Sequence, residues 1–172
     1  MKFLGRMGEL EAFSPPVTPA SIRRRVEKGA PNGEAGRASA ALLTGCVMRI
    51  SFGRINLATV RVLAENGHTV RVPKGQVCCG ALHGHSGDRR TARELARKNI
   101  DIFLDAGADF IITNSAGCGS MMKEYGELLE GDPVYREKAE RLAAKVRDIS
   151  EFLVEQGFRP PSKPPGLRDE EP

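Results

Sequence analysis

Three short apolar segments, which alternate with helix-patterned segments, constrain the fold of this chain more than any other feature. The apolar segments are residues 40–46, 69–72 and 109–114. Between them, residues 54–66 and 88–106 repeat apolar side chains at helical spacing. Strands that alternate with helices predict an α/β fold with a parallel sheet and right-handed crossovers. We therefore expect a small sheet of three to four parallel strands with flanking helices.

Two more helices are expected after the third strand. Residues 120–129 are interpreted as a short helix, and residues 134–156 as a long one. Asp132 is a suitable N-cap for the long helix, and Pro133 a suitable first helical residue. The apolar positions of the long helix form one stripe, which is interpreted as core packing: Leu142, Val146, Ile149 and Leu153.

The chain is long enough, at 172 residues, for one domain with a real core. We expect a partly helical, flexible lead-in over residues 1–39 and the main domain over residues 40–157. Residues 158–172 are rich in proline and predict a disordered tail or linker. The lead-in also carries the excess of positive charge, centred on residues 23–25. This basic run is interpreted as a solvated helix face or a contact with an acidic partner.

Composition argues against several classes of partner and compartment. The chain has no Trp and two Tyr, which disfavours stacking on nucleic-acid bases. No apolar run approaches the roughly 20 residues that span a bilayer, and the N-terminus does not resemble a secretory signal. We therefore expect no membrane span and a cytoplasmic location, where thiols stay reduced. Cysteines in that setting favour ligand or redox roles over structural bridges.

All four cysteines lie shortly after a predicted strand. Cys46 ends the first apolar segment, Cys78 and Cys79 follow the second, and Cys118 follows the third. Ligands of parallel sheets gather beyond the carboxyl ends of the strands. We therefore expect the four sulfur atoms to meet at one edge of the sheet.

The adjacent pair Cys78–Cys79 favours soft-metal chemistry. Neighbouring cysteines rarely bridge each other, because the small ring strains the disulfide, whereas two consecutive thiolates can both face a metal cluster. Glycines flank every cysteine, and Gly80 is a candidate for a backbone N–H that points at a cluster sulfur. His83 and His85 are candidate ligands, proton carriers or hydrogen-bond donors.

Other readings of the same residues stay open at this point. Free cysteines often act as small buried hydrophobic residues. A structural zinc site is less favoured, because zinc ligands usually come in pairs two to four residues apart. A structural or hydrogen-bonding role is also open for each of the two histidines.

Three segments resemble one repeat of the cysteine-rich CCG domain. They are Gly-Cys-Val-Met at 45–48, Gly-Gln-Val-Cys-Cys-Gly-Ala-Leu-His-Gly-His at 75–85 and Asn-Ser-Ala-Gly-Cys-Gly-Ser-Met-Met-Lys-Glu-Tyr-Gly at 114–126. This domain is shared by heterodisulfide reductase subunits and by the iron–sulfur subunits of glycolate and lactate oxidases. The segments Ala-Leu-His at 81–83 and Lys-Glu-Tyr at 123–125 favour the glycolate oxidase branch. The resemblance implies a Rossmann-like half-domain.

The resemblance also implies a function and a ligand set. Cys46, Cys78, Cys79 and Cys118 are then the ligands of an iron–sulfur cluster of the [4Fe-4S] type. The module would relay electrons from a flavin-containing subunit that oxidises glycolate or D-lactate, on the inner face of the cytoplasmic membrane through its partners. The chain lacks a Gly-x-Gly-x-x-Gly fingerprint for its own flavin or nicotinamide, so we expect no catalysis by the chain alone.

The sequence departs from the family pattern at three points. Met121 stands where the pattern has the last cysteine of Cys-x-x-Cys, one repeat is present instead of two, and no ferredoxin-type cysteine run occurs. We therefore expect a piece of a larger subunit, with the cluster completed by a partner chain that carries the second repeat and ferredoxin-like clusters. Two alternatives are a cluster-free thiol/disulfide module and a degenerate scaffold. Lys123 and Tyr125 are interpreted as partner contacts or helix surface.

Overall fold

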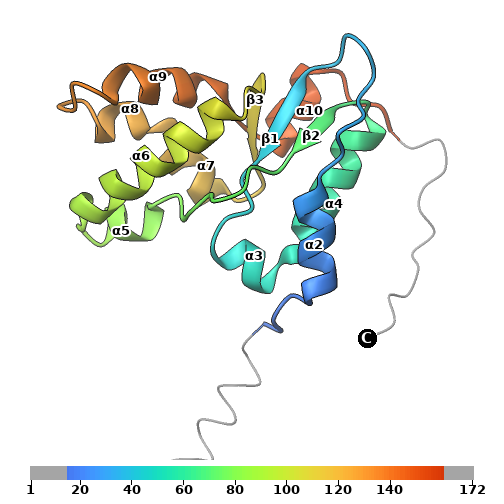
Figure 1. The fold of residues 1–172 in the computed structure, drawn as a ribbon, viewed down its shortest axis with the longest axis horizontal. Coiled ribbons are helices and arrows are strands. Elements are labelled where there is room, and N and C mark those ends of the chain that lie inside the picture. Colours follow the sequence, from blue (N-terminus) through green and yellow to red (C-terminus); the bar gives the residue numbers. More distant parts are fainter. Residues whose placement is uncertain (1–14, 161–172) are drawn as a thin grey trace, which may run out of the picture.

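A four-stranded parallel sheet lies between two layers of helices in the computed structural model, which describes residues 15–160 (Figure 1). This architecture confirms the expected α/β fold with a small parallel sheet. The first part of the expected lead-in and nearly all of the expected tail lie outside the described residues.

The sheet has the strand order β2-β1-β3-β4, and every neighbouring pair is parallel. The chain leaves β1 to form β2 on one side and later returns to form β3 on the other side, so the direction of winding switches at β1. In open α/β sheets such a switch point is where ligands bind, beyond the carboxyl ends of the strands. The strands are β1 (Ser39–Leu42), β2 (Thr69–Arg71), β3 (Phe110–Thr113) and β4 (Val146–Asp148).

The helices follow the expected alternation, with two short additions, and two helices, which begin at Ala116 and Tyr125, replace the single one expected over residues 120–129. Helices α3 and α5 begin directly after cysteine-containing turns and were not expected from the periodicity, because five residues are too few to show it. The helices are α2 (Ala20–Lys28), α3 (Val47–Ser51), α4 (Gly53–Glu65), α5 (Ala81–His85), α6 (Arg89–Asp105), α7 (Ala116–Lys123), α8 (Tyr125–Leu128), α9 (Arg136–Lys145) and α10 (Ile149–Glu155). No helix within residues 15–160 is long and apolar enough to cross a membrane.

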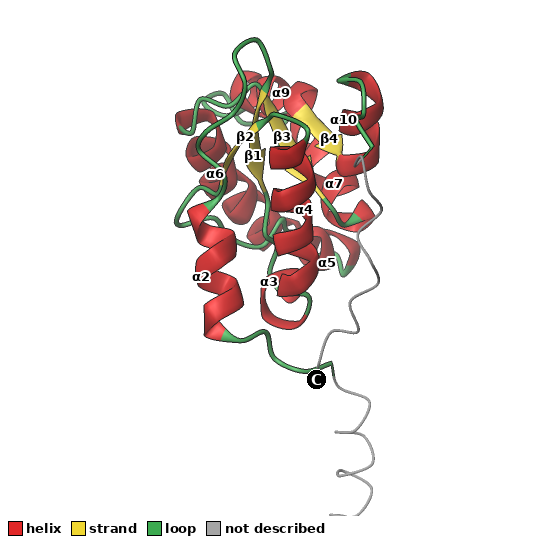
Figure 2. Cartoon of the chain, turned by 90° about the vertical axis from the view of Figure 1, so that its right-hand side faces the viewer, coloured by secondary structure: helices red, strands yellow, loops and turns green. Residues whose placement is uncertain are grey.

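The two faces of the sheet build two separate hydrophobic cores. Ala41 and Ile111 point to the face that α6, α7, α8 and α9 cover. Leu42 and Ile112 point to the opposite face, against residues of α2, α4 and α10. In the turned view, α4 lies in front of the strands (Figure 2). The sheet is thus buried on both faces, which explains its almost continuous apolar strands.

The described part of the lead-in packs onto the domain. Val26 of α2 is buried in the core on the α4 face. After α2, Ala30 forms an antiparallel bridge to Val70, with N–H to O distances of 2.9 and 2.7 Å. This bridge covers part of the outer edge of β2, and α2 is thereby placed beside the carboxyl end of the sheet.

The prediction of one long helix over residues 134–156 is wrong. The chain forms α9, passes through the sheet as β4 and then forms α10. The apolar stripe is split by this passage, because Leu142 and Val146 join one core while Ile149 and Leu153 pack against the other. The predicted start is also wrong by three residues: α9 begins at Arg136 with Tyr135 as its N-cap, and the Asp132 carboxylate instead accepts the N–H groups of the turn that precedes the helix.

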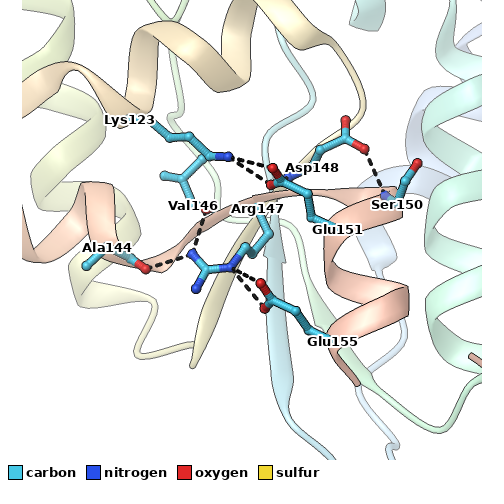
Figure 3. A network of polar contacts seen from close by, with 8 residues as sticks. All are labelled: Lys123, Ala144, Val146, Arg147, Asp148, Ser150, Glu151 and Glu155. Atoms are coloured by element: carbon cyan, nitrogen blue, oxygen red, sulfur yellow. Dashed lines mark hydrogen bonds and ion pairs between the residues drawn. The ribbon is translucent and has the colours of Figure 1, made fainter. Parts of the chain in front are cut away.

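A capping box at Asp148 starts α10 as a new helix directly after β4 (Figure 3). The Asp148 carboxylate accepts the Ser150 N–H at 2.8 Å, and the Glu151 carboxylate accepts the Asp148 N–H at 2.9 Å. Glu151 also pairs with Lys123 of α7, at 2.8 Å. Arg147 binds Glu155 and two backbone carbonyls of the α9–β4 junction. The sequence signal for this start was the pattern Asp-x-x-Glu at 148–151.

Replacement of the cap residue tests this interpretation. Asp148→Ala should lower the free energy of unfolding by about 1 kcal/mol, because the N–H groups of Ser150 and Glu151 lose the Asp148 carboxylate as their acceptor. Asp148→Asn should retain most of the stability, because an amide oxygen is also a good cap. Urea denaturation of both variants measures the difference, and equal losses would contradict the capping role.

His68 is a buried titratable group that makes stability depend on pH. Its ring Nδ1–H donates to the Ala38 carbonyl at 3.0 Å, and the ring packs edge-to-face on Phe152. Burial lowers the pKa of His68 below 6.5; the hydrogen bond to Ala38 opposes this shift, and the positive charges of Arg37 and Arg159 add to it.

The sign of the pH effect follows from that lowered pKa. The unfolded chain binds the proton more readily than the fold does, so stability is full above about pH 6.5 and falls as the pH drops. His68→Gln should reduce the slope of unfolding free energy against pH between about pH 7 and pH 5, by at most about 1.4 kcal/mol per pH unit. The exposed His85→Gln is the control and should keep the wild-type slope; an unchanged slope in His68→Gln would disprove the assignment.

Candidate functional site

The structure brings the four cysteines, which come from three different loops, to the carboxyl edge of the sheet. Cys46 precedes α3, and Cys78 and Cys79 lie in the loop between β2 and α5. Cys118 lies in the first turn of α7, directly after β3. Because the strands are parallel, the three loops leave the sheet on the same side.

The sulfur atoms are arranged as two pairs. Cys46 Sγ and Cys78 Sγ lie 3.5 Å apart, and Cys79 donates a hydrogen bond to Cys118. All four cysteines are free thiols. Within residues 15–160, no three His, Cys, Asp or Glu side chains surround a single point closely enough to hold one metal ion. In a mononuclear site all the thiolates must reach one ion at about 2.3 Å. Two separate pairs of thiols fit a metal cluster better, because each pair can bind different metal atoms.

The two pairs differ in burial and in proton affinity. Cys79 is buried in the core, whereas the other three cysteines are half-buried. The hydrogen bond to Cys118, together with burial, raises the pKa of Cys79. The same hydrogen bond lowers the pKa of Cys118 to about 6. Burial raises the pKa of Cys46, and its contact with Cys78 adds to this shift. The edge therefore carries one thiol that readily becomes a thiolate, beside one that keeps its proton.

Asn99 and Tyr125 bind the peptide groups of the cysteine pair by hydrogen bonds from the buried side. The Asn99 side chain accepts the Val77 N–H at 3.0 Å and donates to the Cys78 carbonyl at 3.0 Å. The Tyr125 hydroxyl donates to the Cys79 carbonyl at 2.8 Å and accepts from Asn99 at 3.3 Å. Both side chains are fully buried, and burial raises the pKa of Tyr125. The interpretation of Tyr125 as a surface or partner residue is therefore wrong.

Gln76 ties the loop after β1 to the loop after β2. Its side-chain oxygen accepts the Thr44 N–H at 2.7 Å, and its amide nitrogen donates to the Leu42 carbonyl at 3.2 Å. A second amide link joins β1 to β3: Asn114 donates to Asn56, which donates to the Thr44 carbonyl. The loops that carry Cys46, the cysteine pair and Cys118 are thus linked by buried and half-buried amide side chains.

Two glycines at the site allow backbone conformations or contacts that a side chain would prevent. Gly80 has φ +90°, which L side chains rarely adopt, and its N–H points to Cys78 Sγ at 3.4 Å. Gly119 follows Cys118 and lies against β3, where a Cβ atom would meet Thr113 Oγ1 at 2.7 Å. Gly119 therefore lets the first turn of α7 sit directly on the strand.

The two candidate histidines, His83 and His85, lie on α5 and take no part in the hydrogen bonds of the cysteines. His83 Nδ1 is 3.5 Å from an Asp88 carboxylate oxygen, and His85 is exposed. Helix α5 packs over α7, where a Cβ atom on Gly84 would contact Met121. The ligand or donor roles of His83 and His85 stay predictions.

Residues 40–123 match the family of cysteine-rich CCG domains. This chain belongs to that family. It is 38% identical over 149 residues to the probable glycolate oxidase iron-sulfur subunit of Bacillus subtilis, a match that covers 87% of this chain and 34% of the relative. It is 35% identical over 118 residues to the glycolate oxidase iron-sulfur subunit of Escherichia coli K12, covering 67% and 29% of the two chains.

Lactate utilization protein A of Geobacillus thermodenitrificans is a further relative, 35% identical over 114 residues, with coverage of 66% and 47%. The chain thus spans less than half the length of these curated relatives. No solved structure matches the chain.

The side chains that hold the cysteine loops of this CCG domain were not predicted from the sequence, for a physical reason. Asn99 and Gln76 act through bonds to backbone groups that are remote in sequence, and no local pattern encodes such pairs. Asn99 lies on the buried face of α6, and an amide among the apolar positions of that face was the available signal. A buried amide needs partners, and at this edge the partners are the cysteine loop.

The two tyrosines of the chain offer a matched test of the loop support. Tyr125→Phe removes the donor to Cys79 O and should lower the free energy of unfolding by about 1–3 kcal/mol, because a buried carbonyl loses its partner. Tyr135→Phe removes a half-buried hydrogen bond to Asp101, whose carboxylate can bond to water instead, and should therefore cost less than Tyr125→Phe. Urea denaturation measures both, and a smaller loss in Tyr125→Phe than in Tyr135→Phe would refute the assigned role.

Proposed function

We propose that this CCG domain holds an iron–sulfur cluster and relays electrons within a glycolate or D-lactate oxidase type of complex. The observation that carries the proposal is the edge of four free thiols, which three loops bring together within one parallel sheet. The names of the relatives, which are iron-sulfur subunits of glycolate oxidase and a lactate utilization protein, support the cofactor and the substrate class. The activity is proposed for the assembled complex.

The residues at the edge fit an iron–sulfur group. The donor set is all sulfur, which suits iron–sulfur clusters, whereas carboxylate sets suit hard cations. Cys46, Cys78, Cys79 and Cys118 would bind the iron atoms. The N–H of Gly80 already points at Cys78 Sγ, and N–H groups aimed at sulfur tune the potential of such groups.

Met121 bears on how the ligand set is completed. Its side chain is buried in the core together with Met122, one turn after Cys118. A core thioether occupies the position that the family pattern gives to another cysteine. The chain therefore supplies four thiolates of a proposed [4Fe-4S] type of cluster, and any further ligand comes from a partner or a second repeat.

The chain's own residues set the environment of this group. When bound, the cluster would accept and release single electrons. The buried side of the site, at Cys79, is closed by the core, whereas Cys46 and Cys78 line an open pocket of about 390 Å³. We place the contact with the electron-donating flavin subunit on this open side. A chain with the second repeat and ferredoxin-like clusters is the proposed onward partner.

A thiol/disulfide module is the second candidate, favoured by the 3.5 Å separation of Cys46 Sγ and Cys78 Sγ. In that case a substrate disulfide would take two electrons and two protons from the two thiols, and Cys46–Cys78 would become a disulfide. Mass spectrometry of protein treated with a small disulfide distinguishes the candidates: a Cys46–Cys78 bridge in iron-free protein favours this one.

Cysteine replacement tests the cluster directly. After anaerobic reconstitution, the wild type should bind about four iron and four sulfide per chain and turn brown. Cys46→Ser and Cys118→Ser should each lose most of the iron, because a hydroxyl replaces a thiolate ligand. Met121→Leu is the matched control on α7 and should bind as much iron as the wild type. A colourless wild type, or serine variants with full iron, would disprove the cluster.

A further inference from the structure

A hollow opens beside Cys46 and Cys78, between α2 and the loops that follow β1 and β2. It has two adjoining parts, of about 270 and about 390 Å³, and Arg23, Arg49 and Gln76 line both. Their combined size lies in the range of small-molecule sites in proteins. One wall comes from the basic run of the lead-in, because α2 is held against α4 (Figure 1).

The walls of the hollow carry an excess of positive charge. Arg23, Arg49 and Lys74 line the smaller part, together with one carboxylate, Glu27. Arg49 pairs with Glu27 at 3.3 Å. Arg23 is half-buried, and its guanidinium makes no ion pair with any carboxylate of residues 15–160. A half-buried guanidinium with no counter-ion among residues 15–160 favours the binding of an anion.

The neutral polar groups around the hollow are already engaged. The N–H and hydroxyl of Thr44 bond to Gln76, and both donors of the Gln76 amide bond to backbone carbonyls. The Gly53 N–H donates to the Thr18 hydroxyl. The side chains of Arg23, Arg49 and Lys74 are therefore the charged groups that can bind an anion here.

We infer that this hollow binds a small carboxylate. Guanidinium groups match the planar carboxylate with two parallel hydrogen bonds, and Val26 and Val72 provide apolar wall for a short carbon chain. The site adjoins the cysteine edge, because Cys46 and Cys78 line the larger part of the hollow, and the groups proposed to hold the carboxylate are Arg23 and Arg49.

Titration of the full chain at low ionic strength tests the site. Acetate and glycolate are the probes, and ¹⁵N NMR follows the arginine side-chain resonances. Both acids should bind saturably, and Arg23→Gln should weaken binding by about tenfold or more, because a charge-assisted hydrogen-bond pair is lost. Arg24→Gln removes the same charge from the exposed neighbouring position of α2 and should change the affinity by less than about twofold.

Three results would overturn the inference. They are no saturable shift with either acid, an equal loss in Arg23→Gln and Arg24→Gln, and tighter binding of inorganic phosphate than of acetate. Arg49→Gln provides a second variant of the same hollow and should also weaken binding. Iron and sulfide analysis is independent of this titration. A chain that binds acetate and no iron would refute the cluster alone, and a chain that binds iron and no acetate would refute the hollow alone.

Discussion

The parallel pairing of β1 with both of its neighbours is the constraint on which the rest of this structure depends. Because β2 and β3 run in the same direction as β1, the loops after all three strands leave at one edge. The switch in winding at β1 places the Cys46 loop between the loops of the other cysteines. An antiparallel neighbour would have sent one cysteine to the opposite edge.

Polar side chains, buried at Asn99 and Tyr125 and half-buried at Gln76, turn this shared edge into a defined arrangement of thiols. Gln76, Asn99 and Tyr125 each bond to backbone groups of the loops and leave the sulfur atoms unobstructed. The loops are therefore held by the domain itself, whether or not a cofactor is present. Such support of the ligand-bearing residues is what a tightly positioned site requires. The lead-in adds a basic wall on the open side, where Cys46 and Cys78 are accessible.

The fold and the convergence of the cysteines were largely predictable, and the errors share one origin. Strand and helix periodicity depend on local side chains, so β1, β2, β3, α4 and α6 were placed to within a few residues. The stripe from Leu142 to Leu153 also has helical spacing, but it feeds two cores on opposite faces of the sheet. Periodicity reports that a side chain is buried and does not report on which face. Tyr125 was misplaced for the same reason, since its partners come from other elements.

The sequence by itself determined the α/β class, the glycine-flanked thiols after three strands and the membership in the CCG family. The tertiary structure alone decided that the thiols form two pairs, that amides from α4 and α6 hold their loops, and that α2 closes a basic hollow beside them. The physical reason is one of range. Alternation and turn chemistry act between residues close in the chain, whereas pairing of sulfur atoms, satisfaction of buried amides and placement of unpaired charge depend on contacts across the sheet.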